Sequence, residues 1–130
     1  MLDPHSSHAE IARKRELYRE ELEKHGHSIA GRDVPIARLL AVAETRDEAE
    51  QVARSGARWL VNSYIDPKHA QVGLAGASFL KLDQDPVDRY LKGVVVWGTP
   101  DEVADELLRL REEMFLDYLL CAPLSHRTFT

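Results

Sequence analysis

The sequence lacks the features that define several large classes of protein. Its single cysteine, Cys121, cannot form an internal disulfide and has no second Cys or close His at a metal-ligand spacing. No apolar run approaches the roughly 20 residues that cross a bilayer, and residues 1–5 lack the basic and apolar regions of a signal peptide. We therefore expect a cytoplasmic protein with no membrane partner, in which Cys121 is a buried, inert thiol.

An excess of positive charge is also missing. The 17 Lys and Arg residues are interleaved with 22 Asp and Glu residues, so no basic face is available for a phosphate backbone and nucleic acid is not an expected partner. The glycine-containing stretch GLAGAS lacks the preceding strand and following helix of a dinucleotide-binding loop, and no internal repeat appears. With 44% hydrophobic and 30% charged residues, the 130-residue chain suits one globular domain.

The six histidines do not form a metal-ligand pattern. The closest pairs have no carboxylate or third His at a spacing that fixes a tetrahedral site, and both lie at helix ends, so no metal is expected. Cys121 and His126 are the one candidate pair for a nucleophile and its base, but no oxyanion donor accompanies them. The closest histidine pairs are His5 with His8 and His25 with His27.

Three segments have the spacing of a capping box, in which a hydroxyl and a carboxylate each bond the other's free backbone N–H at the start of a helix. Apolar residues at helical intervals follow each box, and Gly26 and Gly56 mark the first two helix ends. In the third segment Pro100 stands at the first helical position, where its missing N–H costs nothing. We predict helices over residues 8–25, 45–57 and 99–114, with the boxes Ser7–Glu10, Thr45–Glu48 and Thr99–Glu102.

Two apolar runs predict buried strands. Residues 34–43 are interrupted only by Arg38, which is typical of a strand covered on both faces of a parallel sheet. Residues 117–122 form the second run, which Pro123 stops. Residues 93–97 suit either a short strand or an extended lead-in to the helix that follows, and we favour the lead-in.

Between the second helix and the third, residues 58–92 show no sustained period, although the stretch ARWLVNSY could extend the second helix. A connection of this length is usually functional, such as a lid, or contains elements that the pattern does not reveal. The two interpretations that remain are a flap that closes over a ligand and a solvated loop with no ligand contact. The polar residues that a flap would contribute are Arg58, Asn62, Tyr64, Lys68 and His69.

This order of elements is similar to the end of the luciferase-like monooxygenase family, the flavin- or F420-dependent bacterial luciferase superfamily. The resemblance depends on AVAETRDEAEQVAR, on WLVNSY, and on WGTPDEVADELLRLRE followed by a short apolar strand. It implies an α/β fold that is part of a TIM (β/α)8 barrel, with about two parallel strands and flanking helices. Residues 34–43 would be the seventh strand, 117–122 the eighth, and 8–25 the sixth helix.

The chain departs from the family in what it lacks. The first six strands, which carry most of the flavin contacts in relatives, and the eighth helix are absent, so we expect residues 1–130 to be a single incomplete domain. Met114, Phe115 and Leu116 stand where relatives often have a small residue and Gly.

The resemblance also implies a cofactor, FMN or the deazaflavin F420, and a small-molecule substrate. In a (β/α)8 barrel the active site lies at the carboxyl ends of the strands, so the candidates near the cofactor are Glu44, Thr45, Cys121 and Ala122. Thr45 has a structural alternative as an N-cap, and Ala122 with Pro123 as a strand terminator. No catalytic residue is identified.

Two functions fit these observations. The first is the C-terminal segment of a flavin- or F420-dependent monooxygenase, which supplies a lid and barrel-closing strands, lacks a complete active site by itself, and associates with the rest of the barrel. The second is a non-catalytic remnant or interaction module that forms a homo-oligomer. It would bury strand edges and the helix face of Val103, Leu107 and Leu110 against a second copy.

Overall fold

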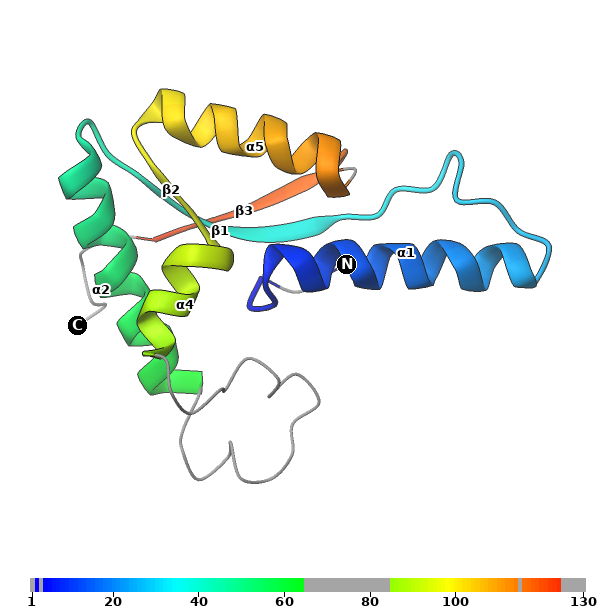
Figure 1. Ribbon diagram of the computed structural model, residues 1–130, viewed down its shortest axis with the longest axis horizontal. Helices are drawn as coiled ribbons and strands as arrows, with labels where there is room; N and C mark the ends of the chain where they lie inside the picture. Colours follow the sequence, from blue (N-terminus) through cyan, green and yellow to red (C-terminus); the bar gives the residue numbers. More distant parts are fainter. Residues whose placement is uncertain (1, 3, 65–84, 115, 125–130) are drawn as a thin grey trace.

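The computed structural model describes residues 2, 4–64, 85–114 and 116–124. Within these residues it contains a parallel sheet and helices on both sides of it (Figure 1). The elements in chain order are α1 (His8–Lys24), β1 (Ile36–Val42), α2 (Arg46–Tyr64), α4 (Pro86–Gly93), β2 (Val95–Gly98), α5 (Pro100–Met114) and β3 (Leu119–Pro123).

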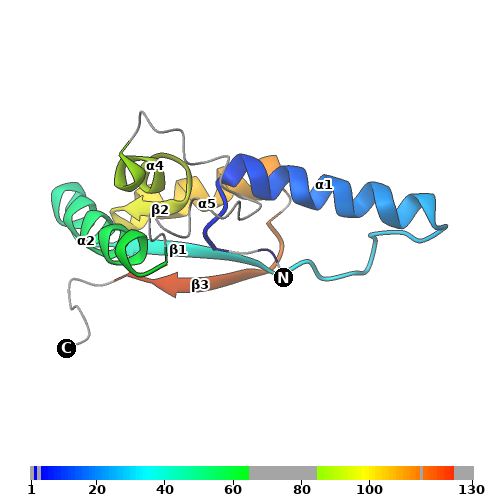
Figure 2. The same ribbon diagram turned by 90° about the horizontal axis from the view of Figure 1, so that it is seen from below.

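The sheet has the order β2-β1-β3, and both pairs of neighbours are parallel. β3 pairs with the first part of β1, from Ile36↔Leu119 to Leu40↔Pro123, whereas β2 pairs with its last part and ends at Val42↔Gly98. Figure 2 shows β1 and β3 side by side. The prediction that the two apolar runs are parallel neighbours, with the Pro100–Met114 helix between them in the chain, is therefore confirmed.

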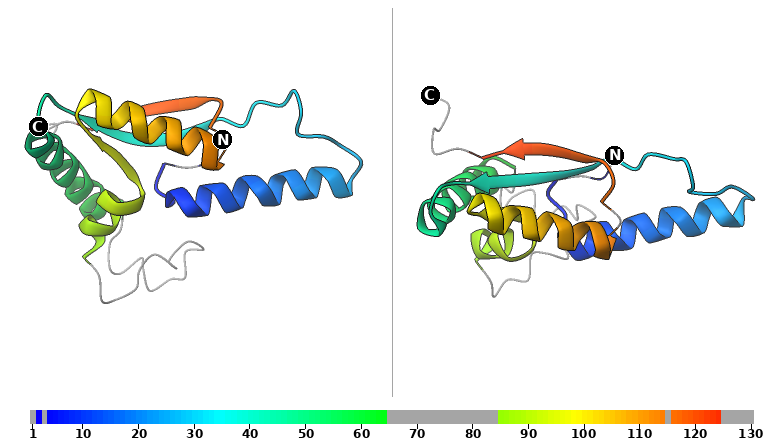
Figure 3. Two further views of the ribbon diagram at one scale, coloured as in Figure 1. Left: turned by 45° about the horizontal axis from the view of Figure 1, so that its top comes forward. Right: turned by 90° about the horizontal axis from the view of Figure 1, so that it is seen from above.

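The two faces of the sheet pack against different helices because side chains alternate along a strand. One cluster joins Leu39, Ala41 and Val95 to α2 and α4. The other joins Ile36, Leu40 and Val96 to α5 and the first turn of α1. In Figure 1, α5 lies on one side of the strands and α2 and α4 on the other. Figure 3 shows α1 continuing well past the start of β1, and Ile11 is its buried residue.

All three predicted helix starts are confirmed. The hydroxyls of Ser7, Thr45 and Thr99 each accept a hydrogen bond from the backbone N–H three residues later, at 3.2, 3.2 and 3.4 Å. At Thr99 the bond is reciprocal, since its backbone N–H donates to Glu102 at 3.0 Å. α1 ends as expected, with Gly26 at φ +75° and its N–H donating to the carbonyl of Glu23.

The region predicted as a lid-like excursion over residues 58–92 is largely regular where it is described. α2 does not stop at Gly56 but continues to Tyr64, and Pro86–Gly93 form α4, which Asp85 caps by accepting from the N–H of Val87. The Gly56 prediction was wrong for a packing reason. A Cβ at this position would lie 2.9 Å from the side chain of Leu124, so the glycine allows a close approach within a helix.

Residues 93–97 correct a second prediction. Residues 95–97 belong to a strand, β2, and are not an extended lead-in, so the sheet has three strands instead of two within the described residues. The short run VVW has no period long enough to distinguish the two, and only pairing with β1 identifies it as a strand.

The face of α5 that was expected to pack on a second copy is instead buried against the sheet and α1 of the same chain. Val103 and Leu110 are buried inside the chain, and Leu107 packs against the same cluster. By contrast, residues 117–122, predicted as a buried strand, form a strand that is half-buried or exposed: Leu120 on β3 and Tyr118 just before it are 37% and 48% exposed, and no described strand pairs with its outer edge.

Cys121, expected to be buried, is exposed on β3. Among the described residues, no helix is both long and apolar enough to cross a bilayer.

Candidate functional site

The carboxyl ends of β1 and β2 lie together. Val42 is paired with Gly98, and the next residue, Ala43, donates its N–H to the carbonyl of Gly98 at 3.3 Å. The chain then turns to α2 on one face of the sheet after β1 and to α5 on the other face after β2. Parallel α/β proteins bind ligands where the connections after two neighbouring strands diverge in this way. The side chains at this edge are therefore the candidates for a ligand site.

Glu102 links the two helix starts. Its Oε2 accepts from the backbone N–H of Thr99 at 3.0 Å and from Nη1 of Arg46 at 3.1 Å. The Arg46 side chain is 58% exposed and that of Glu102 41% exposed, so the ion pair itself contributes little stability. Its effect is positional, because it holds the guanidinium of Arg46 above the end of β2.

Arg46 also stacks on Trp97. Its guanidinium carbon lies 4.5 Å from the centre of the Trp97 ring, within the range of a cation–π contact. The ring is fixed in turn, since its Nε1 donates to the carbonyl of Leu91 at 2.9 Å and its side chain packs against the cluster that includes α2 and α4. The result is a planar cation supported by an aromatic ring, with more than half of the arginine side chain open to solvent.

Gly98 is required for this arrangement. Its φ of +148° is one that L side chains rarely adopt, and a Cβ placed there would lie 2.9 Å from the Cβ of Glu102 and even closer to its carboxylate. Any larger residue would push aside the carboxylate that holds Thr99 and Arg46. The glycine therefore fixes both the turn and the position of the arginine.

The surroundings of Arg46 are acidic. Five carboxylates belong to this edge, and the first turns of both helices contain two each. Helix N-termini attract anions in many proteins, but here acidic side chains already fill that role. The edge therefore does not suit a phosphate group. The five acids are Glu44, Asp47, Glu48, Asp101 and Glu102.

The structure separates the four candidate residues into two groups. Glu44 and Thr45 lie at the carboxyl edge and are exposed, and Thr45 acts as the N-cap of α2. Cys121 and Ala122 pair with Arg38 and Leu39, partway along β1, so they are not brought to the same edge. The sequence reasoning missed the group formed by Arg46, Trp97, Gly98 and Glu102. The available signal was an aromatic residue and a glycine directly before a capping box.

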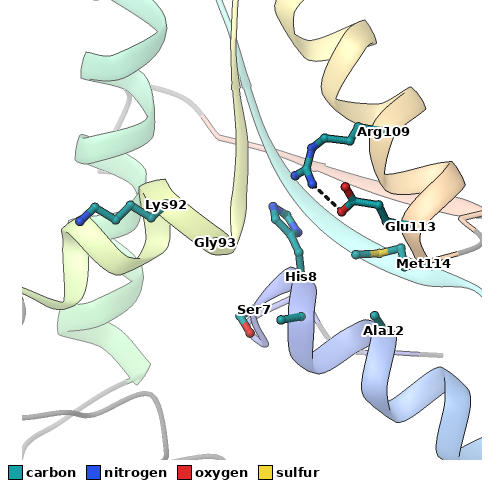
Figure 4. A pocket seen from close by; sticks show the side chains of 9 residues that line it. Ser7, His8, Ala12, Lys92, Gly93, Arg109, Glu113 and Met114 are labelled. Atoms are coloured by element: carbon teal, nitrogen blue, oxygen red, sulfur yellow. Dashed lines mark hydrogen bonds and ion pairs between the residues drawn. The ribbon is translucent and has the colours of Figure 1, made fainter.

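A second polar feature lies at the opposite edge, where the strands begin. A cavity of about 310 Å³ is lined by the start of α1, the end of α4 and the last turns of α5. Figure 4 shows His8 pointing toward Arg109 and Glu113, while the side chain of Lys92 extends away from it. In (β/α)8 enzymes the chemistry takes place at the other end of the strands.

His8 is held by the fully buried Arg38. Nη1 of Arg38 donates to Nδ1 of His8 at 3.0 Å, and its other nitrogens donate to the carbonyls of Ser6 and Ala37 at 2.9 and 2.7 Å. Burial, followed by the positive charge of Arg38, lowers the pKa of His8 from 6.5 to about 4. His8 is therefore neutral at pH 7 and carries its proton on Nε2, because Nδ1 is the acceptor.

The remaining candidates do not assemble into a site. His5 lies beside the Tyr90 ring and His25 bonds the carbonyl of Glu21, and in the described part of the chain no group of three or more His, Cys, Asp or Glu is placed to hold a metal. Arg58 and Asn62 are exposed on α2. Tyr64 is the last residue of that helix, and Lys68, His69 and His126 lie outside the described residues.

Comparison with known proteins gives the family. The model of the luciferase-like monooxygenases matches residues 1–117, and the chain belongs to this family. A search of curated protein sequences gives no match.

Among solved structures, the chain is similar to the oxygenating constituent of 3,6-diketocamphane monooxygenase from Pseudomonas putida, a type II Baeyer–Villiger monooxygenase in complex with FMN. The two are 22% identical with a TM-score of 0.65, over 90% of this chain and 34% of that one. At this identity the likeness supports the fold, and the chain spans about a third of that protein's length.

Proposed function

We propose that this chain is the C-terminal segment of a flavin- or F420-dependent oxidoreductase of the luciferase-like family, acting on a small organic substrate. The observation that carries the proposal is the parallel pairing of β1 with β3, with α5 between them in the chain. The resemblance implies this arrangement for the seventh and eighth strands of a barrel. Family membership and the likeness to a monooxygenase fold support it.

In this proposal α1 and α5 are outer helices of the barrel, because they pack together on one face of the sheet. In the same proposal α2, α4 and β2 belong to an insertion between the seventh and eighth strands. α2 and α4 cover the other face of the sheet, and β2 is anchored beside the carboxyl end of β1 through the pairing of Leu39–Val42 with Val95–Gly98. An insertion at this place lies over the mouth of a barrel, where it can exclude water from a bound cofactor.

The described residues suit only part of a flavin. The carboxylates at the edge would repel a cofactor phosphate, so we assign the phosphate to the part of the barrel that this chain does not contain. Arg46 and Trp97 suit a planar ring. When bound, the flavin would supply the redox chemistry, and this segment would position and enclose it. Activity is therefore expected only together with the remaining strands.

The test begins with the reading frame that precedes Met1. We expect it to encode the first six strands, and the longer product to purify with the absorption spectrum of a bound flavin or to acquire it on addition of FMN or F420. A frame without these strands, together with no spectral change and a stable homo-oligomer of the 130-residue chain, would instead support the interaction module.

A further inference from the structure

We infer that the stacked pair Arg46–Trp97 is a binding platform for a planar, conjugated ring system, the ring of the flavin and not its phosphate. The inference rests on the proposed function, because it assigns one part of that cofactor to this chain. To the proposed function the inference adds a specific contact, which is made by the solvent-exposed side of the Arg46 guanidinium.

The geometry favours a flat ligand. The carbon of the planar guanidinium group lies over the Trp97 ring, 4.5 Å from its centre, and 58% of the arginine side chain is exposed, so a flat ligand can reach this group from the solvent. Glu102 fixes it from the side at 3.1 Å, which reduces the side-chain freedom that a ligand would otherwise have to restrict. Arginine stacks on aromatic rings through its weakly hydrated planar face, and lysine does not.

The carboxylates around Arg46 favour the uncharged ring of the flavin over its phosphate. The phosphate of FMN carries about −1.5 to −2 charges at pH 7, comparable to other phosphomonoesters. At this edge it would meet the five exposed or half-exposed carboxylates with one guanidinium to offset them. Riboflavin has the same ring and no phosphate. We therefore expect the isolated chain to bind riboflavin at least as tightly as FMN.

Trp97 provides the probe. The chain has two tryptophans, and Trp59 is 45% exposed on α2, so Trp59→Phe keeps an aromatic ring at that position and leaves Trp97 as the single tryptophan. In this background we expect riboflavin to quench Trp97 fluorescence in a saturable way. Titration of free N-acetyl-tryptophanamide corrects for absorption by the flavin.

The decisive variant is Arg46→Lys, which keeps the charge and removes the planar face. We expect the riboflavin Kd to rise roughly tenfold, consistent with losing a desolvated cation–π and stacking contact. The matched control is Arg54→Lys on the same helix, where Arg54 is paired with Glu50 and Asp88, and its Kd is expected to stay within about twofold of the parent. Circular dichroism checks that both variants are folded.

Three results would overturn the inference: no saturable quenching of Trp97, equal Kd values for Arg46→Lys and the parent, or FMN binding tenfold or more tightly than riboflavin. Each leaves the proposed function intact if the longer product still acquires a flavin spectrum. Loss of flavin binding in the longer product would reject the proposed function itself.

Discussion

The contact between His8 and Arg38 should make the stability of the protein depend on pH. Nδ1 of His8 accepts a hydrogen bond from Arg38 at 3.0 Å, and this bond requires a neutral imidazole. Protonation would place a second positive charge beside a fully buried guanidinium at the point where α1 meets the sheet. The perturbation to test is therefore acidification from pH 7 to pH 4.

The sign follows from the direction of the pKa shift. In the unfolded chain His8 titrates near 6.5, and in the folded protein its pKa is lowered to about 4. Between these values the unfolded state binds the extra proton, so the stabilising effect is complete above about pH 6.5 and is lost as the pH falls toward 4. At about 1.36 kcal/mol per pH unit the gap corresponds to about 3 kcal/mol, which we reduce to roughly 2 because His8 is partly exposed.

The assay is urea unfolding at several pH values between 7 and 4, with His8→Asn as the control. The asparagine amide oxygen can still accept from Arg38 but does not titrate. The difference in unfolding free energy between parent and variant should shrink by roughly 2 kcal/mol over this range. Taking the difference cancels the contribution of the carboxylates, which both proteins share.

A His8 imidazole that titrates near 6.5 by NMR in the folded protein, or parallel pH profiles for the two proteins, would refute the reasoning. Arg38→Met separates the causes. Because burial is the larger cause, the pKa of His8 should rise only part of the way toward 6.5 when the charge is removed.

Three further predictions concern packing and caps, each measured by urea or thermal unfolding. Leu110→Ala should cost about 2–5 kcal/mol because Leu110 is fully buried, whereas Leu108→Ala on the exposed side of the same helix should stay within about 0.5 kcal/mol. Equal effects would contradict the assigned face. Gly98→Ala should cost roughly 1–3 kcal/mol through its φ and its contact with Glu102, and a neutral result would mean that the turn relaxes freely. Thr99→Ala should cost about 1 kcal/mol, and no loss would show that the cap is dispensable.

The elements predicted correctly are those with local causes. A hydroxyl and the N–H groups that follow it determine where a helix begins, and all of these atoms lie within one turn, so the starts at Ser7, Thr45 and Thr99 follow from the sequence. Continuous apolar runs identified β1 and β3 for a similar reason.

The errors came from features decided by distant contacts. A glycine at position 56 is typical of a helix end. Here it lies within the helix, because the side chain of Leu124, 68 positions away, packs where a Cβ would be. β2 is defined by its pairing with β1, and the exposure of Cys121 depends on which helices cover β3. The Arg46–Trp97 stack joins residues from two elements whose proximity only the sheet order creates. Sequence reasoning located the carboxyl edge through Glu44 and Thr45, but not this group.

The sparse cover of β3 has a practical consequence for anyone handling the purified chain. The run Leu119–Ala122 contains no charged side chain, and Pro123 stands only at its end, so the described residues of β3 offer no charge that repels an extended peptide approaching its outer edge. Attraction of this kind depends on backbone amides and apolar contact. Raising the ionic strength of a storage buffer should not slow aggregation. Dilution of the protein, or one lysine introduced into that run, should slow it.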